Sequence, residues 1–117
     1  MWTFTAYILF KLCESRGRGT LAFSELHTFM FDVLWKKYKI VLNDSSVELK
    51  KEVEYLSELG AVEFNGHTIK INKGRLKEIA LIVEHSQLRD QLLLYREYLS
   101  RINQAIQEVR DNEDTPL

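Results

Sequence analysis

The sequence predicts a mainly α-helical fold with one small β-hairpin, and three observations lead to this prediction. Residues 45–71 have the pattern of a capped helix, a glycine stop and two short strands joined by an Asn-Gly turn. Residues 3–15 and 24–39 are apolar on more than one helical face. From 74 to 110 the apolar residues recur in steps of three and four, which is typical of one long amphipathic helix. The chain has 117 residues, 45% of them hydrophobic, so it can bury a core.

The N-terminal part is expected to form two apolar helices with a short strand between them. Residues 3–15 are the first helix, and the Arg-Gly-Arg-Gly run at 16–19 ends it, because glycines interrupt helices. Residues 20–22 follow as the strand. Ser24 is placed as the N-cap of the second helix, since its hydroxyl can accept a hydrogen bond from an amide of the first turn. This helix is expected to run to about Lys39.

Residues 45–59 are expected to form the third helix. Ser45 and Glu48 have the spacing of a capping box, which satisfies amides that have no partner at a helix start. Gly60 follows where a left-handed residue commonly ends a helix. The apolar positions share one helical face: Leu49, Val53 and Leu56.

Residues 62–71 are expected to form the hairpin. Val62 and Phe64 alternate with polar residues, and Ile69 and Ile71 do the same on the return strand. The pair at 65–66, Asn-Gly, is placed as the two central residues of the turn, because both can take the positive φ angles of a tight two-residue loop.

This order of elements resembles the winged helix-turn-helix family. The resemblance is carried by GTLAFSEL at 19–26 and by LKKEVEYLSELGAV at 49–62, and it extends over 4–72. The first stretch looks like the strand and second-helix start of small bacterial and archaeal regulators, and the second is similar to their recognition helix. The resemblance implies a winged-helix domain over 1–73 whose third helix and hairpin contact double-stranded DNA.

The residues expected to contact DNA are mostly basic and lie at four places in this architecture. These are the loop after the first helix, the end of the second helix, the outward face of the third helix, and the hairpin with the residues just beyond it. Lysine and arginine neutralise phosphates, a valine can contact a thymine methyl, and a glutamate can accept from a cytosine amine. The residues are Arg16, Arg18, Lys36, Lys37, Lys39, Ser46, Val47, Lys50, Lys51, Glu54, Asn65, His67, Lys70 and Lys73.

Charge permits this interface without requiring it. The net charge is −1; residues 1–77 carry 12 Lys and Arg against 9 Asp and Glu, whereas residues 78–117 carry 4 against 8. Cations at the end of the second helix would equally complement the helix dipole. The mixed charges of the third helix would equally suit an ordinary solvated face.

Residues 74–110 are expected to be one long helix that pairs with the same helix of a second copy, with a frayed acidic tail at 111–117. A seam of apolar residues at heptad spacing predicts this coiled coil, and a parallel pair is slightly favoured. In the alternative, the helix folds back over the first and second helices. The expected dimer interface consists of Leu81, His85, Leu88, Leu92, Tyr95, Leu99, Ile102, Ile106 and Val109.

The sequence gives little support for catalysis, and no cofactor, metal or catalytic residue is expected. The three histidines, His27, His67 and His85, have no ligand at metal-binding spacing. Cys13 is the only cysteine, so no intrachain disulfide can form and a reducing, cytoplasmic setting fits best. No apolar run approaches the ~20 residues that span a bilayer, so no membrane partner is expected.

Two functions from different classes follow. The first is a homodimeric winged-helix DNA-binding protein, a transcription regulator. The second is a winged-helix protein–protein interaction module, in which the third helix or the coiled coil binds another protein and DNA is not contacted.

Overall fold

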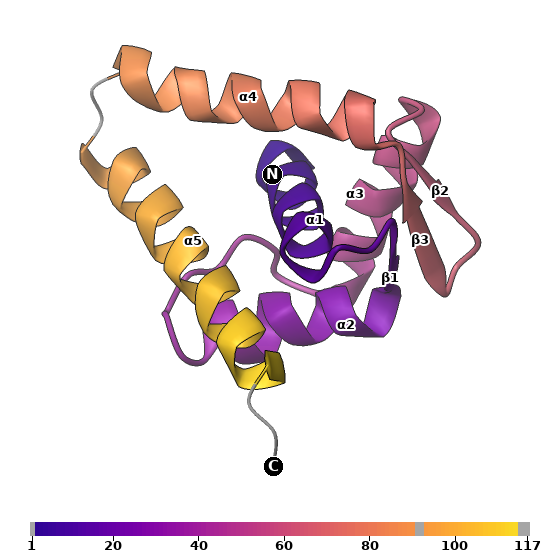
Figure 1. The fold of residues 1–117 in the computed structure, drawn as a ribbon, viewed down its shortest axis with the longest axis horizontal. Coiled ribbons are helices and arrows are strands. Elements are labelled where there is room, and N and C mark those ends of the chain that lie inside the picture. Colours follow the sequence, from indigo (N-terminus) through magenta and orange to yellow (C-terminus); the bar gives the residue numbers. More distant parts are fainter. Residues whose placement is uncertain (1, 91–92, 115–117) are drawn as a thin grey trace.

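The protein is mainly helical and carries a small three-stranded antiparallel sheet at one side (Figure 1). The computed structural model describes residues 2–90 and 93–114, and the side chains of 2–85 and 97–111. The elements in chain order are α1 (Trp2–Arg16), β1 (Thr20–Ala22), α2 (Phe23–Thr28), the π-helical segment η1 (Phe29–Trp35), α3 (Ser46–Glu58), β2 (Val62–Phe64), β3 (Thr68–Ile71), α4 (Lys73–Asp90) and α5 (Leu93–Asp114).

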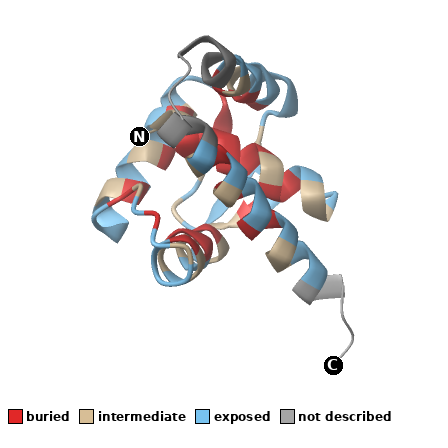
Figure 2. Cartoon of the chain, turned by 90° about the vertical axis from the view of Figure 1, so that its left-hand side faces the viewer, coloured by how far each residue is buried: buried red, intermediate tan, exposed pale blue. Residues whose placement is uncertain are grey.

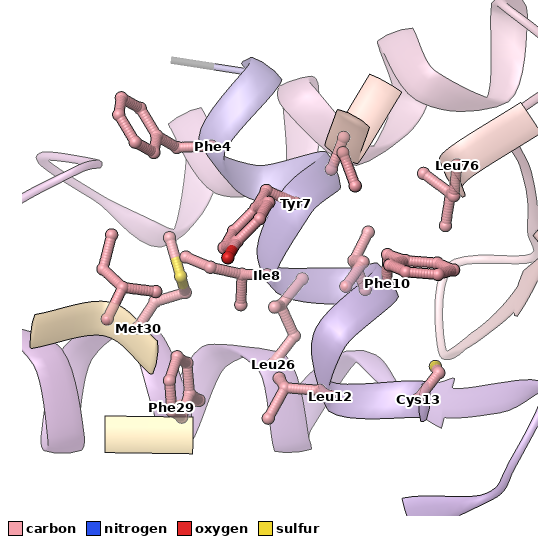
Figure 3. Close-up of a cluster of buried hydrophobic side chains, with 14 of the residues drawn as sticks. Phe4, Tyr7, Ile8, Phe10, Leu12, Cys13, Leu26, Phe29, Met30 and Leu76 are labelled. Carbon is pink, nitrogen blue, oxygen red and sulfur yellow. The ribbon is translucent and has the colours of Figure 1, made fainter. Parts of the chain in front are cut away.

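Helix α1 is the centre of the fold, and α3, α4 and α5 all pack against it. This arrangement explains why α1 is apolar on every side, since a helix surrounded by other elements has no solvent face. In Figure 3, Leu12 of α1 lies near Leu26 of α2 and Phe29 of η1. Phe10 of α1 points toward Leu76 of α4. Burial of each such side chain stabilises the fold by about 1.5–3 kcal/mol. Figure 2 shows the buried residues gathered where the helices face one another.

The N-cap of the second helix is Ala22, two residues before the expected cap, so the prediction of Ser24 as the cap is wrong. The carboxylate of Glu25 reaches back and accepts from the Ala22 backbone N–H at 3.3 Å, which leaves Ser24 inside the first turn. The helix widens into η1 after Thr28 and ends at Trp35, four residues before the expected end at about Lys39. Lys39 then takes a φ of +60° in the following turn.

Helix α3 begins and ends as the sequence predicts. Ser45 is its N-cap, and the Ser45 hydroxyl accepts from the Glu48 N–H at 3.2 Å. The Glu48 carboxylate accepts from Asp44 N–H at 2.8 Å, so only one half of the expected capping box forms. Gly60 has a φ of +75°, and the Ala61 N–H donates to the Leu56 carbonyl at 2.9 Å, which closes the last turn.

The sheet has the order β1-β3-β2, with the hairpin in the register Val62–Ile71 and Phe64–Ile69. This register leaves Gly66 and His67 at the centre of the turn, so the expected Asn65-Gly66 turn is wrong by one residue. Gly66 has a φ of +97°, whereas Asn65 does not have a positive φ. The Asn65 side-chain oxygen instead accepts from the N–H groups of His67 at 2.9 Å and Thr68 at 2.8 Å. An asparagine that caps the turn in this way does not need a left-handed backbone.

The predicted single long helix over 74–110 is wrong. The structure has two helices there, α4 and α5, which run in different directions (Figure 1). Helix α4 packs along α1, and α5 packs across α1 and η1, which matches the alternative in which the chain folds back on itself. Helix α5 also continues to Asp114, so the first four residues of the predicted frayed tail are helical, and the last three, 115–117, lie outside the described residues.

Polar contacts as well as apolar burial hold α5 in place. Arg101 donates to the backbone carbonyl of Tyr38, and the Tyr38 hydroxyl donates to Glu108. Burial, and then the hydrogen bond to Glu108, raise the pKa of Tyr38 to about 12. The Tyr7 hydroxyl of α1 donates to Asn103 at 2.8 Å.

Among the described residues, no helix combines the length and the apolar character of a membrane span.

Candidate nucleic-acid interface

The outward face of α3 is the first part of the candidate interface. Because Leu49, Val53 and Leu56 are buried, the opposite face of the helix is solvent-exposed. It presents Val47, which is 62% exposed, together with Lys50, Lys51 and Glu54. Neither lysine forms an ion pair within the described part of the chain. Ser46 is also exposed, at the first turn.

The β2–β3 hairpin is the second part. Asn65 and His67 are exposed at its tip, where the Asn65 cap holds the turn. Lys70 lies on the outer face of the sheet, between Thr20 of β1 and Glu63 of β2 in the register. Its charge is therefore partly offset by Glu63. Lys73 is exposed at the start of α4.

The two arginines at the end of α1, Arg16 in its last turn and Arg18 just beyond it, are used within the fold. Arg16 and Arg18 both bind the carboxylate of Glu25, Arg18 at 2.9 Å, and the Arg16 side chain is only 10% exposed. Partial burial alone would raise the pKa of Glu25, but the hydrogen bonds from Arg18 and from the Ala22 N–H, with the two arginine charges, lower it. The structure therefore directs both arginines toward α2 and does not present Arg16 to solvent.

The three lysines after η1 divide in the same way. Lys36 pairs with Asp32 at 3.4 Å, and Lys37 pairs with Glu108 of α5 at 3.1 Å. Lys39 is exposed and has no ion pair with any residue that the structure describes. Among the predicted DNA contacts, the lysines without an ion pair in the described residues therefore lie on α3, on the hairpin and at the start of α4, and one more follows η1. They are Lys50, Lys51, Lys70, Lys73 and Lys39.

The structure does not place the predicted dimer seam on one exposed face. Leu99, Ile102 and Ile106 are buried in the chain's own core, and Val109 is partly buried. On α4, Leu81 and His85 remain exposed. The side chains of Leu88 and Tyr95, and residue Leu92 as a whole, lie outside the described residues.

Two groups of aromatic residues were not predicted from the sequence. On α2 and η1, the rings of Phe23, His27, Phe31 and Trp35 follow one another at centroid distances of 6.4, 4.6 and 5.7 Å. Their spacing of four residues was a visible signal for this row. The other group pairs Trp2 with Tyr55 at 5.3 Å, and no sequence pattern indicates it because 53 positions separate the residues.

Cys13 and the acidic residues give no sign of a catalytic or metal centre in the described residues. Burial raises the pKa of the Cys13 thiol, which disfavours the reactive thiolate. Across 2–85 and 97–111, no three His, Cys, Asp or Glu side chains come together in a way that could hold a metal ion.

No protein-family model matches this sequence, and neither a curated protein nor a solved structure shows significant similarity to it. What the protein does must therefore be inferred from the chemistry of its own residues.

Proposed function

We propose that this chain is a winged-helix protein that binds double-stranded DNA through α3 and the β2–β3 hairpin. The element order and the sheet order β1-β3-β2 support the resemblance to the winged-helix family. The observation that carries the proposal is the exposed N-terminal half of α3. It presents an apolar Val47 and two lysines, Lys50 and Lys51, without ion pairs among the described residues. This combination suits a helix that contacts bases and phosphates in a major groove.

The charges predict weak and salt-sensitive binding. Five predicted contacts, Lys39, Lys50, Lys51, Lys70 and Lys73, have no ion pair within the described residues, while Glu54 and Glu63 oppose them. Each phosphate that a lysine neutralises contributes about 0.9 to the slope of log K against log salt concentration. We expect dissociation constants of about 10⁻⁴–10⁻⁶ M on mixed-sequence duplex at physiological salt.

The test compares Lys50→Ala with Lys77→Ala in a salt series on a fluorescent mixed-sequence duplex. Both lysines are exposed on helices and have no described ion pair, but Lys77 lies on α4, outside the candidate interface. The two variants are compared at a concentration at which sedimentation gives them the same oligomeric state. Lys50→Ala should lower the salt slope by about 0.9, whereas Lys77→Ala should leave it unchanged. Equal effects of the two variants would show that binding is non-specific to the surface, and absence of binding by the wild type would overturn the proposal.

A second function, protein binding, is favoured by the aromatic row on α2 and η1. Phe23, His27 and Phe31 are only partly buried and Trp35 is exposed, so parts of this row remain accessible to a partner. Partly exposed aromatic residues are enriched in protein interfaces. If Trp35→Ala left DNA binding intact but abolished capture of a protein partner, this function would be preferred.

We further propose that self-association uses α4 in place of the predicted coiled coil. Leu81 is 42% exposed and Ile82 is 63% exposed on this helix. If two copies of α4 cross antiparallel about Leu81, two-fold symmetry brings Glu78 of one copy opposite His85 of the other, and Lys77 toward Glu84. The opposite charges of Lys77 and Glu84, on either side of an apolar centre, favour the pair.

Sedimentation of Leu81→Asp tests this arrangement. The substitution places a charge on an exposed side chain, so the fold should persist while the dimer dissociates. A wild-type protein that sediments as a monomer at micromolar concentration, or a Leu81→Asp variant that remains dimeric, would contradict it.

A further inference from the structure

A hollow of about 320 Å³ lies between the N-terminus of α1 and the flank of α3, and of its lining residues the proposed functions use only Lys51. It opens to solvent and is lined by two aromatic rings, two carboxylates and one lysine. These residues are Trp2, Glu48, Lys51, Glu52 and Tyr55. The hollow thus combines an apolar surface with a net negative charge, and this combination restricts the chemistry of a ligand.

The aromatic part consists of Trp2 and Tyr55. Their ring centroids are 5.3 Å apart and their planes meet at 67°. Neither residue is fully buried, and Tyr55 is among the exposed large hydrophobic residues of the protein. Aromatic rings that solvent can reach attract a cation through their quadrupole, and tryptophan does so most strongly.

The carboxylates are held in place by the surrounding structure. Glu52 accepts from the Asn43 side-chain amide at 2.7 Å and from the Thr5 hydroxyl at 3.3 Å. Thr5 and Asn43 are themselves buried, so Glu52 is anchored from below. Glu48 accepts from the Asp44 N–H at 2.8 Å. Carboxylates fixed beforehand lose little conformational freedom when a ligand binds.

We propose that this hollow binds a small organic cation of the quaternary ammonium class. The methyl groups of such a cation contact the rings, while its charge is neutralised by the two carboxylates. A neutral apolar ligand would remove water from Glu48 and Glu52 and supply no opposite charge of its own, which is unfavourable. An anion would meet two carboxylates and only one lysine. The proposal does not depend on DNA binding, because only Lys51 belongs to both sites and the ligand contacts are assigned to Trp2, Tyr55, Glu48 and Glu52 on the flank of α3 nearest α1.

The experiment is a titration with choline chloride, followed by the indole N–H signals of the two tryptophans in ¹H–¹⁵N NMR spectra at constant ionic strength. The Trp2 signal should shift with saturation, and the Trp35 signal should not. The control ligand is 3,3-dimethyl-1-butanol, in which an uncharged carbon replaces the quaternary nitrogen. It should bind at least about fivefold more weakly, because it lacks the cation–π attraction and the ion pairs.

Three variants separate this site from general surface effects. Glu48→Gln should weaken choline binding, and Glu58→Gln, an exposed glutamate on α3 outside the hollow, should not. Lys51→Ala should strengthen binding, because it removes the one cation of the lining. Strengthened binding cannot arise from a damaged fold. Absence of a saturable Trp2 shift, equal affinity for choline and the butanol, or weaker binding by Lys51→Ala would each overturn the proposal.

Discussion

Replacement of Leu99 by alanine tests whether α5 belongs to the core of one chain. The Leu99 side chain is 1% exposed, and α5 packs on α1 and η1. Alanine lacks three of the carbons of leucine, which at about 0.8 kcal/mol each gives a transfer term of about 2.4 kcal/mol. The cavity left behind adds to this, within the range of about 2–5 kcal/mol for such substitutions. We expect about 3 kcal/mol, because the Arg101 and Asn103 contacts of α5 restrict its collapse into the space.

The matched control is Leu59→Ala at the end of α3, a position outside every interface proposed above. Leu59 is 38% exposed, so its truncation should cost less than about 1 kcal/mol. Urea unfolding followed by circular dichroism gives both free energies, and sedimentation gives the oligomeric state. In a chain of this length, about 3 kcal/mol should lower the melting temperature by roughly 10 °C or more.

Protein concentration separates the two architectures. If Leu99 is buried within one chain, the destabilisation of Leu99→Ala is the same at every concentration. If Leu99 instead lay in a coiled-coil seam between two chains, the variant would dissociate and its melting temperature would depend on concentration. Equal stabilities of Leu99→Ala and Leu59→Ala, or a destabilisation that disappears at high concentration, would refute the packing of α5 described above.

Two further predictions concern the hairpin and the pH dependence of stability. Gly66→Ala should cost about 1–2 kcal/mol because Gly66 has a φ of +97°. Gly19→Ala should cost nothing comparable, since at both glycines an added Cβ would meet no atom within 4 Å and only Gly66 is left-handed; equal costs in urea unfolding would contradict the turn. Hydrogen bonds from the Tyr38 hydroxyl and then from Lys37 lower the pKa of Glu108 below 4.5. The stability that this lowered pKa contributes is present above pH 4.5 and is lost as the pH falls through the folded-state pKa. Between pH 7 and pH 3 the wild type should therefore lose more stability than Glu108→Gln, and equal losses would show that these contacts do not persist in solution.

The sequence indicates which residues of the candidate interface lie on the outward face of α3. It does not indicate which basic side chains remain available to bind a phosphate. The periodicity of Leu49, Val53 and Leu56 orients that helix, and its outward residues follow from the same periodicity. The commitment of Arg16 and Arg18 to Glu25 depends on how α1, β1 and α2 fold against one another. The hollow beside Trp2 depends in the same way on α1 lying next to α3.

The sequence by itself determined the local elements, because their signals act between near neighbours in the chain. The Ser45 cap, the left-handed Gly60 and the strand alternation after it all belong to this class. Only the tertiary structure decided the partner of the apolar stripe in α5. Periodicity shows that Leu99, Ile102 and Ile106 need burial, but it is the same whether the covering surface belongs to a second copy or to the chain itself. That choice depends on contacts between residues far apart in sequence, such as Tyr7 with Asn103 and Tyr38 with Glu108. These contacts arise only once α5 lies across α1 and η1.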